Sequence, residues 1–315
     1  MGVSEFGAQI RAEVSKAVVG QERALENVLV AILANGHVLL EGVPGVAKTL
    51  MIRAISKALD LPFSRVQFTP DLMPSDIIGT NVFDPKTTDF RLHKGPIFTS
   101  ILLADEINRT PPKSQAALLE AMEERQATID GVRYPLPEPF LVFATQNPIE
   151  FEGTYPLPEA QQDRFLLKVL LEYPPTEVEL EVLRRFHAGF RSLKLEEAGI
   201  QPVANLESLK AARAEVDQVV IEDKILAYIL NIVQATRTSN ELFVGASPRA
   251  GQALVSCSKA TAALRGRNFV IPDDVKGLAP AVLRHRVVLR PEAEIEGLTV
   301  DRILHGLIEA QPVPR

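Results

Sequence analysis

The chain has 315 residues, of which 46% are hydrophobic and 23% are charged, with one cysteine and a net charge of −6. This length is sufficient for two ordinary domains with buried cores, and a single cysteine excludes an internal disulfide framework. The acidic balance argues against nucleic acid as the partner, because proteins that bind nucleic acid without sequence preference use a basic surface.

The N-terminal residues 1–16 contain no apolar segment of the kind that marks a secretory signal. The longest apolar run, 28–34, is far shorter than the ~18 residues that a membrane span needs. We therefore expect a cytoplasmic protein with no membrane span.

The first half of the chain alternates short apolar runs with segments of helical periodicity, the pattern of a parallel sheet flanked by helices. Most of these runs are continuously apolar, as expected for strands that are covered on both faces. The expected strands are 38–40, 66–68, 101–104, 141–144 and 165–170, and the expected helices are 22–34, 48–59 and 113–124. We predict a five-stranded parallel α/β domain over residues 1–173.

Two segments interrupt this alternation, and both have the pattern of an inserted hairpin. The first covers 81–98, and the second covers 126–137, where Asp130-Gly131 between β-forming residues is a strong hairpin signal. After Tyr173, two consecutive prolines break the pattern, and the rest of the chain is almost wholly helical in period. We predict a small all-α domain over residues 174–315.

A glycine-rich loop directly follows the strand at 38–40 and begins the next helix. Its sequence is Gly42-Val43-Pro44-Gly45-Val46-Ala47-Lys48-Thr49. A polyphosphate needs many donors at short range, and the loop's N–H groups, the helix N-terminus and a lysine provide them together. We expect this loop and the following Leu50 to bind the phosphates of ATP, with the Thr49 hydroxyl offered to Mg²⁺.

Ala47 stands where the general pattern of such loops has glycine. Because a left-handed conformation is costly for any residue with a Cβ, we expect Ala47 to have a negative φ. The sharp bend is then expected at Gly45, with Pro44 fixing φ just before it. The Ala47 methyl group should point away from the phosphates.

Asp105 and Glu106 end the apolar run at 101–104. Carboxylates at the carboxyl end of a parallel strand face the crevice where ligands bind. We expect Asp105 to hold Mg²⁺ through its water shell and Glu106 to polarise the water that attacks the γ-phosphate. No guanine-reading Asn-Lys-x-Asp motif is present, so ATP is the expected nucleotide.

The order of these motifs along the chain resembles the MoxR family of AAA+ ATPases. The further segments that carry the resemblance are Val19-Gly20-Gln21, Ala104-Asp105-Glu106-Ile107-Asn108-Arg109, Ala144-Thr145-Gln146-Asn147-Pro148, Glu159-Ala160-Gln161-Gln162-Asp163-Arg164-Phe165 and Gly245-Ala246-Ser247-Pro248-Arg249. An alanine in place of the loop glycine is usual in that family. The resemblance implies that Val19, Gly20 and Gln21 border the adenine ring.

The resemblance also implies roles for three residues beyond the loop. Asn147 would help to orient the attacking water, and Arg164 would be an arginine finger that reaches the γ-phosphate of a neighbouring subunit. Arg249, at the start of a helix, would be a second phosphate sensor, acting in cis or in trans. A turn-forming asparagine, a surface ion pair and an exposed arginine remain the simpler interpretations of these residues.

A ring, most often a hexamer, is implied by the resemblance, as is ATP hydrolysis coupled to remodelling or maturation of a client protein. Relatives often act on proteins with a von Willebrand factor A domain, and their hairpin inserts approach the ring's pore. Candidate pore contacts are Phe83, Lys86, Arg91, His93, Arg133 and Tyr134. A hairpin that serves only subunit packing is the alternative.

Three other functions remain compatible with the same loop. A P-loop phosphotransferase would need an acceptor pocket, and phosphate release without an added acceptor would argue against it. A DNA-linked AAA+ motor would show ATPase stimulation by DNA that declines steeply with salt. A nucleotide-switched scaffold would bind ATP and barely hydrolyse it.

Overall fold

The centre of the molecule is a five-stranded sheet in the order β2-β5-β8-β1-β9, with every neighbouring pair parallel. The computed structural model describes residues 1–86, 88–148, 154–189 and 195–314. The strands of this sheet are β1 (Val38–Gly42), β2 (Phe63–Gln67), β5 (Ile101–Asp105), β8 (Leu141–Gln146) and β9 (Leu167–Leu171). The predicted five-stranded parallel sheet is confirmed.

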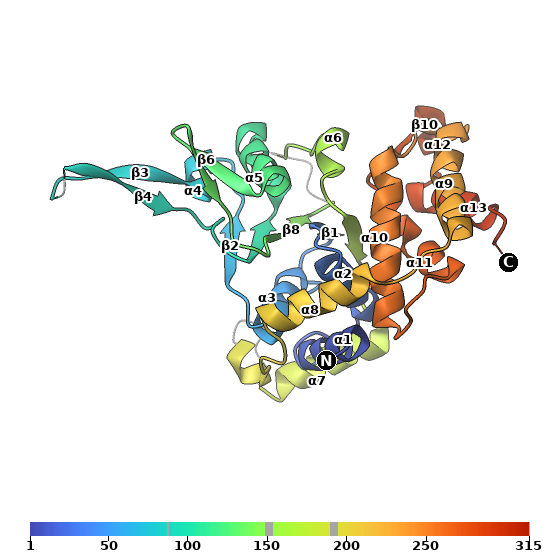
Figure 1. Ribbon diagram of the computed structural model, residues 1–315, viewed down its shortest axis with the longest axis horizontal. Coiled ribbons are helices and arrows are strands. Elements are labelled where there is room, and N and C mark those ends of the chain that lie inside the picture. The colour runs from blue at the N-terminus through green and yellow to red at the C-terminus, as the bar shows by residue number, and fades with distance from the viewer. Residues whose placement is uncertain (87, 149–153, 190–194, 315) are drawn as a thin grey trace.

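Helices cover both faces of the sheet (Figure 1). The first face carries α1 (Val3–Val14), α2 (Glu22–Leu33) and α3 (Lys48–Ala58), and the second carries α4 (Pro74–Ile78) and α5 (Pro112–Glu124), with η1 (Ile107–Arg109) and α6 (Glu159–Gln162) in the connections. Leu40 and Leu103 enter the core of the first face, whereas Leu39 and Leu102 enter the core of the second. Both faces of each strand are therefore apolar, which explains the continuous apolar runs.

The strand β2 begins earlier than the predicted 66–68, because it lies at an edge of the sheet. Of its five residues only Val66 is buried, so the strand does not form one apolar run. An edge strand with polar side chains gives a weaker sequence signal than a central strand.

Both predicted hairpins are present. They are β3 (Gly79–Asp84) with β4 (Asp89–Lys94), and β6 (Gln126–Ile129) with β7 (Val132–Pro135). Thr87, near the tip of the first, lies outside the described residues. In the second, Asp130 and Gly131 both have positive φ, 48° and 80°, as a tight hairpin turn requires. The first hairpin projects well beyond the body of the molecule (Figure 1).

The chain after Pro174 is mainly helical, with one short two-stranded ribbon. Its elements are α7 (Thr176–His187), η2 (Leu195–Ala198), α8 (Leu206–Asp217), α9 (Asp223–Thr238), β10 (Leu242–Val244), α10 (Pro248–Leu264), α11 (Pro272–Leu283), β11 (Val288–Leu289), α12 (Pro291–Ile295) and α13 (Val300–Glu309). Helices α8 and α10 pack on α1 and α2, and α11 packs on β9. Within the described residues, no helix is both long and apolar enough to cross a membrane.

His37, immediately before β1, is a buried histidine that the fold keeps neutral. Its Nδ1 accepts a hydrogen bond from the Val142 N–H at 3.0 Å, so the proton resides on Nε2, which faces the Met122 carbonyl oxygen at 3.3 Å. Burial lowers the pKa of His37 to about 3, and the nearby Arg125 charge acts in the same direction. Protonation would break the bond from Val142 and place a charge in the core.

We expect the free energy of unfolding to fall as the pH drops below the ordinary histidine pKa of 6.5. The unfolded chain binds a proton there and the folded chain does not, so this loss continues down to about pH 3, with nothing gained above pH 6.5. From neutral pH to about pH 5, His37 alone should contribute a loss of about 2 kcal/mol.

The measurement is urea unfolding at both pH values for the wild type, His37→Asn and the exposed-site control His93→Asn. The asparagine at 37 can still accept from Val142, and it should reduce the acid sensitivity. Equal acid sensitivity of His37→Asn and wild type would contradict this account.

Candidate functional site

The glycine-rich loop leaves the carboxyl end of β1, the strand next to the edge strand β9. Gly42 is the last residue of β1, and a Cβ added there would lie 2.5 Å from the Leu171 carbonyl oxygen of β9. Close approach of the two strands therefore requires glycine at the start of the loop. Gly45 lies at φ +89° with open space around it, so the expectation of a sharp bend there is confirmed.

The expectation of a negative φ at Ala47 is wrong. Ala47 has φ 63° and ψ 22°, a left-handed conformation directly before α3. A left-handed residue beside a helical one makes successive backbone N–H groups converge, which is the geometry of an anion-binding nest. The loop thus turns at Ala47 as well as at Gly45, while the Ala47 side chain packs against the core of the first face.

We expect Ala47→Gly to stabilise the nucleotide-free protein by about 0.5–1 kcal/mol, because glycine has no steric cost at this φ. Part of that gain is lost to the greater freedom of glycine in the unfolded chain. Chemical denaturation measures the effect, with the helical glycine substitution Ala54→Gly as the control that should destabilise. A destabilised Ala47→Gly protein would contradict the conformation.

Lys48 and Thr49 begin α3 and face the carboxyl edge of the sheet. Lys48 Nζ donates to the carbonyl oxygens of Gly42 and Val43, in the latter case at 3.2 Å. Thr49 Oγ1 lies 3.4 Å from Asp105 Oδ2, so the loop and the end of β5 meet at this hydroxyl. Leu50 instead packs its side chain against the core of the first face.

Both carboxylate oxygens of Asp105 are engaged by neighbouring strands. Oδ1 accepts from the hydroxyl of Thr145 on β8 at 2.6 Å. Oδ2 accepts from the guanidinium of Arg65 on β2, at 2.6 Å from Nη2 and 3.0 Å from Nε. Arg65 thus places a positive charge on the oxygen that also faces Thr49.

Glu106 has an unusual backbone conformation for a glutamate. Its φ is 57°, and its N–H donates to Thr145 Oγ1 at 2.8 Å. The carboxylate accepts from Gln67 Nε2 at 2.8 Å and pairs with Arg109 Nε at 3.2 Å. Left-handed non-glycine residues persist where surrounding contacts hold them, and they concentrate at functional sites. Asn147 follows β8 at the same edge and is buried.

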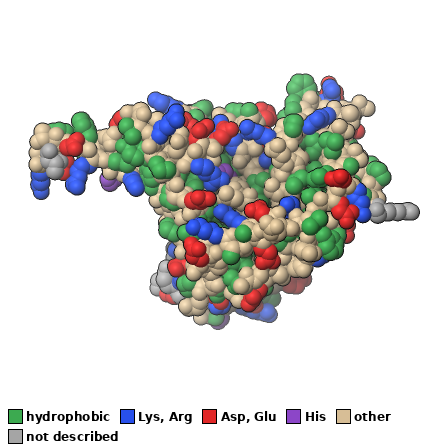
Figure 2. Space-filling view, viewed as in Figure 1, with side chains coloured by type: hydrophobic (Ala, Val, Ile, Leu, Met, Phe, Trp, Pro, Cys, Tyr) green, Lys and Arg blue, Asp and Glu red, His purple; other side chains and the backbone are tan. Residues whose placement is uncertain are grey.

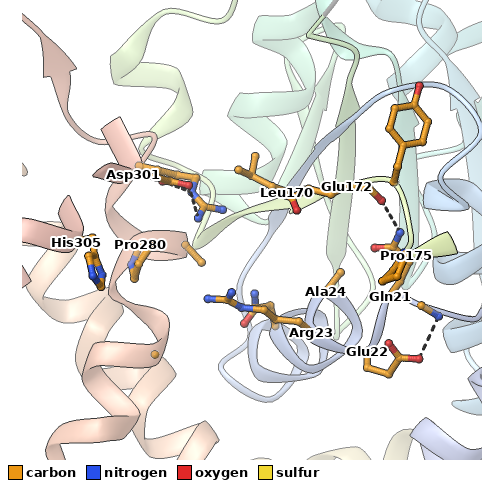
Figure 3. A pocket seen from close by; sticks show the side chains of 16 residues that line it. Gln21, Glu22, Arg23, Ala24, Leu170, Glu172, Pro175, Pro280, Asp301 and His305 are labelled. Atoms are coloured by element: carbon orange, nitrogen blue, oxygen red, sulfur yellow. Dashed lines mark hydrogen bonds and ion pairs between the residues drawn. The ribbon is translucent and has the colours of Figure 1, made fainter. Parts of the chain in front are cut away.

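A cavity of about 470 Å³ opens beside this edge (Figure 3). Gly20 and Gln21 line it from the start of α2, and α11, α13 and the residues after β9 complete its walls. Gln21 Nε2 donates to the Glu172 carbonyl oxygen at 2.9 Å, which fixes this wall to the end of β9. Of the three residues predicted to border adenine, Gly20 and Gln21 thus face a cavity large enough for a base.

The donors present fit a magnesium ion that is bound together with a nucleotide. Among the described residues, no group of three His, Cys, Asp or Glu side chains could hold a metal by itself. Mg²⁺ at a nucleotide needs only one or two protein oxygens, since phosphates and waters supply the others. Thr49 Oγ1 and Asp105 Oδ2 are such a pair.

Arg164 and Arg249 meet at one carboxylate, that of Glu123 near the end of α5. Arg164 Nη2 lies 3.0 Å from Glu123 Oε2, and Arg249 Nη2 lies 3.5 Å from Oε1. This cluster lies at the amino edge of the sheet. Leu166, two residues after Arg164, donates its N–H to the carbonyl oxygen of His37, and His37 immediately precedes the first residue of β1. The loop lies beyond the opposite end of β1.

Known proteins match this chain over almost its entire length. A model of the ATPase family associated with various cellular activities (AAA) matches residues 37–167, and an AAA lid domain model matches residues 234–307. Chaperone MoxR1 of Mycobacterium tuberculosis is 42% identical over 312 residues, or 96% of this chain and 81% of that protein. The chain belongs to the MoxR family of AAA+ ATPases.

Further similarities agree with this assignment. The Bacillus subtilis protein YeaC is 47% identical to this MoxR-family ATPase over 301 residues, 96% of the chain and 92% of YeaC. The crystal structure of an ATPase candidate from Cytophaga hutchinsonii has a TM-score of 0.89 at 41% identity, covering 99% of this chain and 97% of the other. The predicted family, fold and ATPase activity are confirmed.

In this MoxR-family ATPase the predicted residues form two groups at opposite edges of one sheet. The loop 42–50, Asp105, Glu106 and Asn147 share the carboxyl edge, and Arg164 with Arg249 shares the amino edge. Sequence reasoning missed the partners that hold them, namely Arg65, Gln67, Thr145 and Glu123. The sequence offered one signal for Arg65, namely a charged residue within a strand at the edge of the sheet. That strand, β2, pairs with β5, which ends at Asp105 and Glu106.

Proposed function

We propose that this MoxR-family ATPase hydrolyses magnesium-bound ATP between subunits of a ring, and uses the cycle to remodel or mature a client protein. The observation that carries this proposal is the position of the two arginines at the sheet edge opposite the loop. A strand of five residues is roughly 16 Å long, so neither arginine can reach a phosphate on its own subunit's loop. The two arginines would instead contact the phosphates of a nucleotide that is bound to a neighbouring subunit.

At the carboxyl edge, Lys48 and the N–H groups of the loop would bind the β- and γ-phosphates. Thr49 and Asp105 would hold Mg²⁺, which supplies charge neutralisation to the phosphates when bound. Arg65 lies on the same oxygen of Asp105, so its guanidinium has to move or share that oxygen. Gly20 and Gln21 would border the adenine in the adjoining cavity.

Glu106 and Asn147 would act on the attacking water. In the present arrangement Gln67 and Arg109 both contact Oε2 of the Glu106 carboxylate, so Oε1 would accept the hydrogen bond from the water. The buried Asn147 lies at the end of the adjacent strand β8, where its amide could fix the same water. Loss of the water position, and not loss of binding, is the expected effect of changing either residue.

The shared carboxylate of Glu123 supports the proposal that Arg164 and Arg249 work as a pair. Two guanidinium groups that converge on one anion can converge on another, and a phosphate carries more negative charge than a carboxylate. Both arginines would then act in trans, on the γ-phosphate of the neighbour. This supports a closed ring, in line with the hexamer that the family implies, because each subunit supplies a loop to one neighbour and arginines to the other.

The projecting β3–β4 hairpin is the best candidate for client contact. Phe83 and Phe90 are 49% and 66% exposed and lie edge to face, with ring centroids 5.5 Å apart. Lys86 and Arg91 are exposed beside them, and Figure 2 shows basic side chains gathered on this projection. Asn81 Nδ2 donates to Asp130 Oδ2 at 2.9 Å, so the second hairpin stands alongside. We propose that a protein with a von Willebrand factor A domain contacts this surface.

The test is capture of the client by a Glu106→Gln protein that holds ATP without turning it over. We expect a protein retained in ATP and released in ADP, identified by mass spectrometry. The double variant Phe83→Ser, Phe90→Ser should assemble and bind ATP but lose that protein, whereas the exposed-aromatic control Phe269→Ser should retain it.

Two outcomes would overturn the proposal. Phosphate release that depends on an added acceptor would indicate a phosphotransferase. Salt-sensitive stimulation by DNA, with no protein retained, would indicate a DNA-linked motor.

A further inference from the structure

Arg286, which follows α11 by three residues, reaches across to the segment that carries Arg164. Its Nε donates to Asp163 Oδ1 at 2.7 Å, and its Nη2 donates to the Phe165 carbonyl oxygen at 2.7 Å. The same Nη2 lies 3.4 Å from the Asp163 carbonyl oxygen, and Nη1 donates to that of Leu166 at 3.1 Å. One guanidinium thus binds the residues on both sides of Arg164.

The Asp163 carboxylate joins a second element to this guanidinium. Its Oδ2 accepts from Ser247 Oγ at 3.3 Å, and Ser247 is the residue before α10, two positions from Arg249. Asp163 therefore lies between the segment of Arg164 and the helix of Arg249. Both arginines then meet at Glu123, so their spacing is set at two points, the carboxylates of Asp163 and Glu123.

We call Arg286, Asp163 and Ser247 together the brace. Its central ion pair, between Arg286 and Asp163, is largely buried. The Arg286 side chain is only 3% exposed and that of Asp163 is 19% exposed. Burial lowers the pKa of Arg286, and the hydrogen bond and charge of Asp163 oppose that shift. A planar fork with five donors matches one carboxylate and several carbonyl groups at once, which a lysine ammonium cannot do.

Apart from Arg286, the segment is held by its own helical turn, by the core and by a second residue of the lid. The helix α6 (Glu159–Gln162), which leads into Asp163, has no buried residue, so apolar packing before Arg164 is absent within that helix. After Arg164, the buried ring of Phe165 and the contact of its carbonyl oxygen with His285 Nε2 at 3.0 Å come from the core and the lid. The backbone N–H groups of residues 163–166 thus bond within the core domain. The carbonyl oxygens of Asp163, Phe165 and Leu166 are bound by Arg286 and His285 of the lid.

We propose that Arg286, acting through Asp163 and Ser247, is a positioning residue that presents Arg164 and Arg249 to the neighbouring subunit as one rigid pair. The inference rests on the proposed trans role of the two arginines and extends it to the lid. Movement of α11 relative to the sheet would shift the brace, and with it the arginines that serve the next nucleotide. Orientation of one subunit's lid is thereby coupled to hydrolysis at its neighbour's site.

The test is the isosteric variant Asp163→Asn, which keeps the volume and weakens the bond from Arg286. Displacement of a catalytic group by about 1 Å can cost roughly 10²-fold in rate, so we expect kcat to fall roughly 10- to 100-fold. The KM for ATP should change less than about 2-fold, because the variant's own loop is intact. Glu309→Gln, which removes an exposed lid ion pair with Lys276, should leave both constants unchanged.

Mixed rings separate positioning from general damage. Asp163→Asn subunits keep an intact loop, so activity should return when they are mixed with Lys48→Ala subunits, whose arginines are intact. Activity should not return with Arg164→Ala subunits. Recovery with Arg164→Ala instead of Lys48→Ala, or an unchanged kcat, would overturn the proposal.

Failure of the trans role itself has a different signature, since Arg164→Ala and Lys48→Ala subunits would then not complement each other. If Asp163→Asn does not fold, Ser247→Ala tests the same proposal, because it removes the hydrogen bond from Ser247 to Asp163. A smaller loss with the same complementation pattern supports the proposal, and wild-type kcat for Ser247→Ala overturns it.

Discussion

Arg164→Ala should lower the ATPase rate roughly 10³-fold or more, the scale on which an arginine finger acts in related phosphoryl transfers. The guanidinium stabilises charge that develops on the transferred phosphoryl group, so the loss should appear in kcat. The KM for ATP should change little, because the guanidinium acts mainly on charge that develops in the transition state and not on the bound ground state. Steady-state phosphate release measures both constants.

Complementation shows whether this effect crosses the subunit interface. Mixing Arg164→Ala with Lys48→Ala subunits creates interfaces where an intact loop faces an intact arginine, and activity should partly return. The exposed lid variant Arg302→Ala serves as the control and should behave as wild type. Absence of recovery in rings that demonstrably contain both subunits would count against action in trans.

Glu106→Gln should keep ATP binding and lose at least ~10²-fold in hydrolysis, the usual contribution of a positioned base. The amide cannot take a proton from water, but it preserves the size of the side chain and the hydrogen bond to Gln67. Nucleotide affinity measured by titration should remain near the wild-type value, in contrast to Lys48→Ala, which should lose affinity.

The control for this prediction is Glu120→Gln on the exposed side of α5. Wild-type turnover in Glu106→Gln would remove Glu106 from the chemistry. Unchanged nucleotide binding in Lys48→Ala would likewise remove Lys48 from the phosphate site.

The left-handed conformation of Glu106 links the fold to this prediction. The turn after β5 carries the carboxylate toward Gln67 on β2, and Thr145 holds both the Glu106 N–H and Asp105 Oδ1. The two acids at the end of β5 are therefore oriented by strands on either side. Their chemistry depends on β2 and β8 as much as on their own strand.

Local patterns in the sequence were sufficient for the elements and for the family. Continuous apolar runs identified the central strands because both faces of those strands are buried, as Leu39 and Leu40 show. The glycine-rich loop and the two acids after β5 were readable because phosphate and metal binding require those residue types at those places. Each of these signals lies within a few consecutive residues.

Tertiary structure decided what depends on residues far apart in the chain. The positive φ of Ala47 follows from the loop's path between β1 and α3, which overrides the preference of alanine. The contacts of Arg65 with Asp105, of Glu123 with two arginines, and of Arg286 with Asp163 join segments distant in sequence. Spacing along the chain does not predict such contacts, because they form only when the strands take their order in the sheet and the lid packs against it.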